Sequence, residues 1–253
     1  MGNSNETKSK KIQEKEKDNE VDDSEEQYYM NIIKNLNINL DKIKNNLKKY
    51  NKNDEFVVLI ESGSLAPPHK MHIGLMELTK TFIEKEQKKK VIGGFVIPSS
   101  NAYVKYKLKK DFINLKHRVN MTKLMIKDSD WLECLDWGFA CGEKIKMLLD
   151  KIIKKEFPEY NIKSFLVFGI DYYIRNKMYL NDEYICIFRP GYDMDVVKKM
   201  YPKNLIFIEG SNEDISSSKI RKAFRENDEK TILEMTSKEI FDYLKDNNIF
   251  ENN

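Results

Sequence analysis

From about residue 55 onward, short apolar runs alternate with longer segments in which apolar residues recur every three or four positions. Leu75, Leu78 and Phe82, for example, share one face at helical spacing. The short runs predict strands at 55–60, 91–97, 131–135, 164–168, 184–188 and 204–208. The longer segments predict helices at 72–88, 114–127, 138–156, 193–200, 216–226 and 237–247. This alternation predicts a Rossmann-like, doubly wound α/β fold with a mostly parallel sheet and helices on both faces.

The first 50 residues have a different pattern. Residues 1–26 are mostly Lys, Glu, Asp, Asn and Ser, with almost no apolar residue. Such a stretch cannot bury enough apolar surface to offset the entropy of ordering it, so we predict a disordered charged tail. Apolar residues recur through 27–50, which indicates a helical extension packed on the domain. The remaining residues, 51–253, are predicted to form the α/β domain.

Charge and cysteine content narrow the class of protein. The chain has 44 basic and 41 acidic residues and a net charge of +3, which gives no case for nucleic-acid binding. Cys134, Cys141 and Cys186 form no C-x-x-C pair, which favours reduced thiols in a cytoplasmic or nuclear protein. Glu6 stands where a myristoylation motif beginning at Gly2 needs Ser or Thr, and no apolar run reaches the length of a membrane span. We therefore expect no stable membrane association.

The segment 63–72, GSLAPPHKMH, stands between an apolar strand and an amphipathic helix. A glycine loop at this junction is where α/β proteins bind phosphate, because backbone N–H groups and the helix dipole face the anion. His69 and His72 add side-chain donors. Alone, an H-x-x-H pair is most often a surface residue and a helix cap, and a zinc site would need a third ligand that the nearby sequence lacks.

A second helix start lies at 214–221, DISSSKIR. Ser216 and Ser217 are suitable N-cap residues, and a Ser hydroxyl can also bind a phosphate oxygen. Arg221 would lie about one turn into the helix. By itself this stretch is an ordinary N-cap followed by a solvated Arg, but beside the first loop it predicts a nucleotide site built from two helix N-termini.

Together, the two segments resemble the signature of the nucleotidyltransferase superfamily, a G-x-F-x-P-x-H-x-x-H loop followed by an I-S-S-T-x-I-R helix start. Further stretches resemble the eukaryotic nicotinamide/nicotinate mononucleotide adenylyltransferases. These are IPSSNAYVK at 97–105, HRV at 117–119, DWLE at 130–133, FGID at 168–171 and IFRPG at 187–191. The resemblance implies that 51–253 is a nucleotidyltransferase domain. It also implies in-line transfer of the AMP moiety of ATP to a pyridine mononucleotide, giving NAD or its deamido form and pyrophosphate.

The resemblance further implies roles for individual residues. The catalytic groups would be His69, His72 and Arg221. ATP would be bound by Gly63, Ser64, Leu65, His69, His72, Gly169, Asp171, Ser216, Ser217 and Arg221. The mononucleotide would be bound by Ser64, Tyr103, Lys105, Trp131, Glu133 and Arg189, with Trp131 stacked on the pyridine ring. Mg²⁺ would accompany ATP, held by phosphate oxygens and water more than by the protein.

Several of these side chains also have structural explanations. Lys105 belongs to a lysine-rich stretch, 105–110, that an ordinary solvated face would explain. Trp131 at a strand start is also typical of a core residue, and Trp137 favours a structural role. Arg189 follows a strand and fits either the adenine or the edge of the sheet.

The segment between Asp171 and Tyr184 departs from the family. It is short and lacks the second stacking Trp of eukaryotic relatives, and Tyr172, Tyr173 and Tyr179 are the available substitutes. The choice between nicotinamide and nicotinate therefore stays open.

Two other functions compete with this interpretation. One is a sibling nucleotidyltransferase that acts on phosphopantetheine or another phosphate ester, and the other is a non-catalytic nucleotide-binding or chaperone-like scaffold. The W-x-E and A-Y-x-K stretches favour the pyridine branch, and two intact anion loops disfavour the scaffold. The resemblance is also compatible with a homo-oligomer.

Overall fold

The computed structural model describes residues 31–139, 142–172, 184–188, 191–200 and 205–250. The predicted tail lies outside these residues. The same is true of four residues from the sequence analysis, Cys141, Tyr173, Tyr179 and Arg189. The chain divides into two units, residues 1–37 and 38–253. In the first unit, the described residues 31–35 are helical, and the Asn35 amide donates to the Asn31 carbonyl at 3.0 Å.

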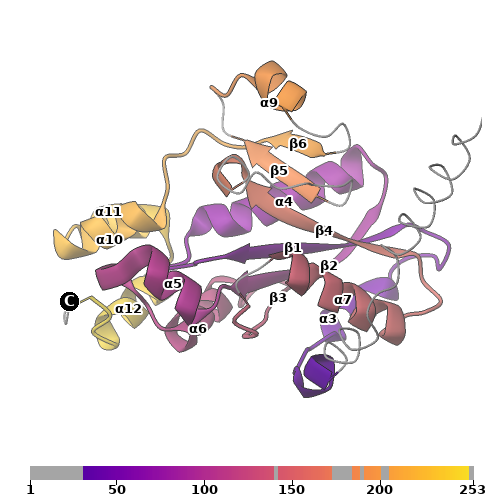
Figure 1. The fold of residues 1–253 in the computed structure, drawn as a ribbon, viewed down its shortest axis with the longest axis horizontal. Coiled ribbons are helices and arrows are strands. Elements are labelled where there is room, and N and C mark those ends of the chain that lie inside the picture. The colour runs from indigo at the N-terminus through magenta and orange to yellow at the C-terminus, as the bar shows by residue number, and fades with distance from the viewer. Residues whose placement is uncertain (1–30, 140–141, 173–183, 189–190, 201–204, 251–253) are drawn as a thin grey trace, which may run out of the picture. The chain divides into compact units, whose positions relative to one another are not determined.

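Within the described residues of the second unit, parallel strands form one six-stranded sheet in the order β3-β2-β1-β4-β5-β6 (Figure 1). The strands are β1 Phe56–Gly63, β2 Lys90–Pro98, β3 Leu132–Cys134, β4 Ile162–Gly169, β5 Tyr184–Phe188 and β6 Ile206–Glu209. The strand order runs outward in both directions from β1, so β1 and β4 flank the switch point where α/β proteins bind ligands. The predicted Rossmann-like α/β fold is confirmed.

Most of the described helices lie where the apolar periodicity predicts them. They are α3 Asp41–Leu47, α4 Lys70–Lys85, α5 Asn101–Leu108, α6 Leu115–Met125, α7 Gly142–Glu156, α9 Met194–Met200, α10 Ser217–Arg225, α11 Glu229–Met235 and α12 Lys238–Asp246. A 3₁₀ turn, η1, spans Lys109–Asp111. None of the described helices is long and apolar enough to cross a bilayer.

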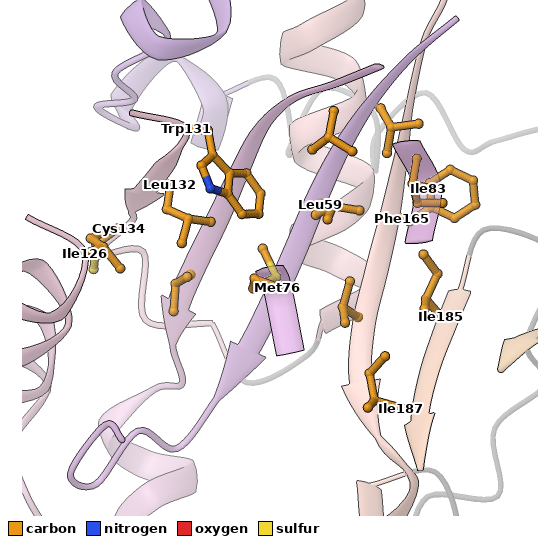
Figure 2. Packing of buried hydrophobic residues seen from close by; sticks show 14 of the residues in the cluster. Leu59, Met76, Ile83, Ile126, Trp131, Leu132, Cys134, Phe165, Ile185 and Ile187 are labelled. Atoms are coloured by element: carbon orange, nitrogen blue, oxygen red, sulfur yellow. The ribbon is translucent and has the colours of Figure 1, made fainter. Parts of the chain in front are cut away.

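Helices cover both faces of the sheet (Figure 1). Alternate residues of β1, Val57 and Leu59, face a core cluster that includes Met76 and Ile83 of α4. Figure 2 shows this cluster, with Leu59 and Met76 close together across the helix–sheet interface. The glycine Gly142, which opens α7, lies against Leu166 of β4, so α7 packs on the opposite face.

The two adjacent glycines of β2 show how closely helices approach this strand. A Cβ on Gly93 would lie 2.5 Å from the Ile43 side chain of α3, and a Cβ on Gly94 would lie 2.7 Å from Trp131. Real carbon atoms do not approach so closely, so both faces of β2 require glycine there. The Asn46 amide of α3 also donates to the Ile92 carbonyl at 3.0 Å.

Helix α3 belongs to the larger unit, which begins at Ile38. The boundaries placed at 26 and 50 remain predictions. Helices α5 and α11 were not expected from the sequence. Only Val104 of α5 and Ile232 of α11 are fully buried, so neither helix carries the long apolar stripe that identifies α4 or α7.

Candidate active site

A cavity of about 270 Å³ opens beyond the carboxyl ends of β1, β4 and β5, at the switch point of the sheet. A smaller cavity of about 110 Å³ adjoins it, and Ser64, Lys107 and Phe168 line both. Figure 1 shows α5, α10 and α11 gathered beyond the arrowhead of β1. The sequence-predicted residues that line the larger cavity are Gly63, Ser64, Leu65, His69, His72, Gly169, Asp171 and Ser217.

His69 and His72 lie at the start of α4, with their rings stacked at a centroid distance of 3.7 Å. The backbone N–H of His69 donates to Nδ1 of His72 at 3.0 Å. Burial lowers the pKa of His72 well below its usual value, and the nearby His69 lowers it further. The ring is therefore neutral at pH 7. Since Nδ1 accepts a hydrogen bond, the single proton of this neutral ring is on Nε2, which is a donor available to a ligand.

Arg118 fixes the first part of the loop that follows β1. It is fully buried and donates from Nη1 to the Ser64 carbonyl at 3.0 Å, from Nε to the Ile113 carbonyl at 2.8 Å, and from Nη2 to Asn101 at 3.3 Å. Burial lowers the pKa of Arg118 to about 10, which still leaves the guanidinium charged at neutral pH. This buried cation ties α5, α6 and the loop together.

Arg221 of α10 acts on the same loop. Its Nη1 donates to the Ala66 carbonyl at 2.8 Å, and its Nε forms an ion pair with Asp111 at 3.2 Å. Its Nη2 donates to the Ser218 hydroxyl at 3.0 Å. The predicted phosphate ligand is therefore a buried clamp on the loop, and it does not line either cavity.

Two further side chains hold the next carbonyls. The Ser217 hydroxyl donates to the Pro67 carbonyl at 2.8 Å, and the Thr236 hydroxyl donates to the Pro68 carbonyl at 3.2 Å. The hydroxyl of Ser216 caps α10 by accepting from the Lys219 N–H. Each bound carbonyl points its partial negative charge at a protein donor, which leaves the cavity side better suited to an anion.

Asp171 lines the cavity just beyond β4, as expected for a group that follows a strand at the switch point. Its carboxylate accepts a hydrogen bond from the Tyr192 hydroxyl at 3.0 Å. Gly169 lies beside it, and a Cβ there would contact nothing within 4 Å, so this position is open toward the cavity.

The lysine that reaches the cavities is Lys107 rather than Lys105. The Lys107 ammonium donates to the Ser64 hydroxyl at 3.0 Å and lies 5.6 Å from the ring centre of Tyr103. Lys107 and Tyr103 line the smaller cavity, whereas Lys105 lines neither cavity. Residues two apart on a helix do not share a face, which is why only one of the two can reach the site.

The structure places Trp131 in the core instead of at the cavities. Its side chain is 4% exposed, its indole N–H donates to Glu77 of α4 at 2.9 Å, and Lys80 lies 5.0 Å from its ring centre. Figure 2 shows the ring packed over the same face as Leu132 and Met76. Trp131 precedes β3 and so lies at the amino end of the strand, which excludes it from stacking on a ligand at the carboxyl end.

Glu133 and Arg189 complete the predicted set. Glu133 pairs with Lys42 of α3 at 3.8 Å and lines neither cavity. Arg189 lies outside the described residues. Leu65 lines the larger cavity with a left-handed backbone, φ 47°, which marks the sharp turn of the loop.

Trp137, for which the sequence favours a structural role, follows the carboxyl end of β3 and lines neither cavity. Its indole Nε1 is buried and has no hydrogen-bond partner among the described residues, and its ring meets Phe139 edge-on at 6.1 Å. An aromatic residue just past a parallel strand is a signal that the switch-point rule could have found.

A cation would find few ligands in the protein itself. Among the described residues, no group of three or more His, Cys, Asp and Glu side chains is arranged to hold a metal ion.

Comparison with known proteins supports the resemblance found in the motifs. The chain is 41% identical over 81 residues to nicotinamide/nicotinic acid mononucleotide adenylyltransferase 1 of Bos taurus, covering 32% of this chain and 27% of that protein. It is 35% identical over 81 residues to the type 2 protein of Xenopus tropicalis, covering 32% of this chain and 25% of that protein. The match thus spans only about a quarter of the length of these curated relatives.

A solved structure and a family profile cover much more of the chain. The structure of Plasmodium falciparum nicotinic acid mononucleotide adenylyltransferase complexed with NaAD matches with a TM-score of 0.53 and 20% identity, covering 79% of this chain and 99% of that chain. This likeness shows a shared fold. The profile of the cytidylyltransferase-like family matches residues 61–223, from the middle of β1 into α10. The chain therefore belongs to the cytidylyltransferase-like family.

Proposed function

We propose that this protein joins the AMP moiety of ATP to nicotinamide or nicotinate mononucleotide and releases pyrophosphate. The observation that carries the proposal is the convergence of two helix starts on one cavity. His72 of α4 and Ser217 of α10 line it together, although they are far apart in the chain. Both helix N-termini offer the positive end of a dipole to an anion, as a triphosphate requires.

The reaction is an in-line displacement. An oxygen of the mononucleotide phosphate forms a bond to the α-phosphorus of ATP, and the bond between that phosphorus and the bridging oxygen of pyrophosphate breaks. The attacking phosphate is already an anion at pH 7, so no general base is required. Catalysis then consists of alignment and stabilisation of negative charge.

The described residues support both tasks. The neutral His72 ring donates from Nε2 to an oxygen of the triphosphate, and the Lys107 ammonium supplies positive charge where the two cavities meet. Asp171 accepts hydrogen bonds from the ribose hydroxyls. Arg221 is a positioning residue in this scheme, because it binds the Ala66 carbonyl of the loop and Asp111 and does not line the cavity. Mg²⁺ bound together with ATP would neutralise part of the phosphate charge.

The pyridine ring is assigned to Trp137 in place of Trp131. Trp137 lies past the carboxyl end of β3, and its buried N–H lacks a partner within the described residues. Tyr172, which lines both cavities, is the described candidate for the second aromatic wall. We also propose a cytoplasmic or nuclear location. The family resemblance predicts a possible homo-oligomer.

The direct test is pyrophosphate release by the purified protein with ATP, Mg²⁺ and one acceptor at a time. The acceptors are nicotinamide mononucleotide, nicotinate mononucleotide and phosphopantetheine. Release with either pyridine nucleotide supports the proposal, and the ratio of the two rates measures the preference. Release with phosphopantetheine alone would assign a sibling reaction, and ATP binding without release from any acceptor would favour a scaffold.

A further inference from the structure

Glu61 of β1 is an ionisable residue at a core position. Along β1 the side chains of Val57 and Leu59 face the α4 side of the sheet, and strand alternation puts Glu61 on the same face. Its backbone is paired with Val96 of β2 and Val167 of β4, so the side chain rises from the middle of the sheet. It lines the larger cavity at the level where α4 begins.

The Glu61 carboxyl group is desolvated and incompletely satisfied. The residue is only 5% exposed, and Oε2 is buried with no hydrogen-bond partner among the described residues. Desolvation raises the pKa of this carboxyl to about 8, so most of it is protonated at neutral pH. A buried polar atom without a partner destabilises the protein, and a ligand that bonds to it recovers that loss.

The groups around Glu61 are those of an anion site. The titratable side chains that share its cavity are His69 and His72 from α4, Lys107 from α5, and Asp171 and Tyr172 after β4. Helix α7 packs on the opposite face of the sheet and sends none to this cavity. An ionised Glu61 would repel a phosphate here, whereas a protonated carboxyl offers one O–H donor beside the donors of α4.

We propose that Glu61 binds a phosphate oxygen of the nucleotide by donating a hydrogen bond from its carboxyl group. The identity of the ligand as a nucleoside triphosphate rests on the proposed function, but the donor role concerns binding and does not require turnover. Glu61 is thereby a phosphate-binding residue whose contribution disappears when the carboxyl ionises.

The experiment is calorimetric titration of the full chain with ATP in EDTA, at pH 7.5 and pH 9.5, for the wild type, E61Q and E61M. Glutamine keeps an N–H donor of the same reach but does not titrate, whereas methionine keeps the volume and has no donor. The expected dissociation constant of the wild type rises by about tenfold or more between the two pH values, since ionisation converts a donor into a repelling charge. E61Q should bind like the wild type at pH 7.5 and change little at pH 9.5, and E61M should bind about tenfold more weakly at pH 7.5.

Two results would overturn the proposal. One is the same pH dependence of ATP binding in the wild type and E61Q, and the other is binding by E61Q that is as weak as that of E61M at pH 7.5. Adenosine, which has no phosphate, serves as the control ligand and should bind all three proteins alike. Thermal unfolding at pH 7.5 checks that each variant is folded.

The outcome is separable from that of the proposed function. Pyrophosphate release with a pyridine nucleotide and a pH-insensitive Glu61 would leave the function standing and remove this inference. The opposite outcome is also distinguishable. If E61Q makes ATP binding insensitive to pH but no acceptor gives pyrophosphate release, this inference stands and the proposed function fails.

Discussion

The two ends of the parallel sheet follow opposite rules. At the amino end of β3, Trp131 is buried, its N–H is bonded to Glu77, and Lys80 covers its ring. At the carboxyl ends, Glu61 is buried and Trp137 is half-buried, and each has a buried polar atom that lacks a partner among the described residues. One end has satisfied its polar groups within the protein, and the other keeps groups available for a ligand. The contrast separates residues that stabilise this fold from residues that bind.

The largest expected effect is a loss of stability on replacing Trp131, which lies at the amino end of the sheet. Replacing Trp131 with Ala removes a ring packed against Met76 and Leu132 and leaves Glu77 without its donor, so we expect a loss of about 3–5 kcal/mol in the free energy of unfolding. Urea unfolding measures it. The matched variant is W137A, which should lose far less stability and instead raise KM for the pyridine nucleotide. Equal stability losses in the two variants would erase the contrast.

His72 gives the largest expected effect on turnover. H72A removes the Nε2 donor from the cavity, and we expect kcat to fall about 10²–10³-fold with little change in the unfolding midpoint. Steady-state pyrophosphate release measures the rate. H117A is the control, because His117 bonds to the Tyr243 hydroxyl and lines neither cavity. A kcat for H72A within a factor of about two of that of H117A would remove His72 from the proposed chemistry.

Glu61 should make stability depend on pH. Its folded pKa of about 8 lies above the usual value of 4.5, so the folded state binds the proton more tightly. The resulting stability is complete below about pH 4.5 and is lost as the pH rises through about 8, a change on the order of a few kcal/mol.

The measurement is urea unfolding of the wild type and E61Q at pH 6 and pH 9. The wild type should lose stability relative to E61Q at the higher pH, since Gln does not titrate. His72 contributes with the opposite sign at lower pH, because its lowered pKa removes stability as the pH falls. A constant difference between the two proteins across this range would show that Glu61 is not desolvated.

The smallest expected effect separates two neighbouring lysines. K107A removes the contact with Ser64 where the cavities meet, and we expect kcat/KM to fall about 10–100-fold. K105A should stay within about twofold of the wild type, because Lys105 lines neither cavity. The reverse order of effects would restore the interpretation that the sequence motif favours.

Hydrophobic periodicity predicted every strand of the described sheet, because buried parallel strands are nearly continuous apolar runs. It missed α5 and α11, because each buries only one residue fully and so lacks a long apolar stripe. The glycine loop and the second helix start were both located from local chemistry. Trp131 was assigned to the ligand because the motif resemblance was given more weight than its predicted place at the start of a strand, which the structure confirms. Glu61 was missed because a carboxylate within an apolar run carries no local signal of its burial.

The loop after β1 has a consequence for how the protein comes into being. Its carbonyls at 64, 66, 67 and 68 are held by donors that lie 54, 155, 150 and 168 residues further along the chain. Contacts of such sequence separation form late, since the closure of the intervening chain must precede them. A ribosome that has translated only as far as β6 has released the strand and the histidines but none of the last three donors. Nucleotide binding should thus arise only after the segment that ends at Thr236 has left the ribosome.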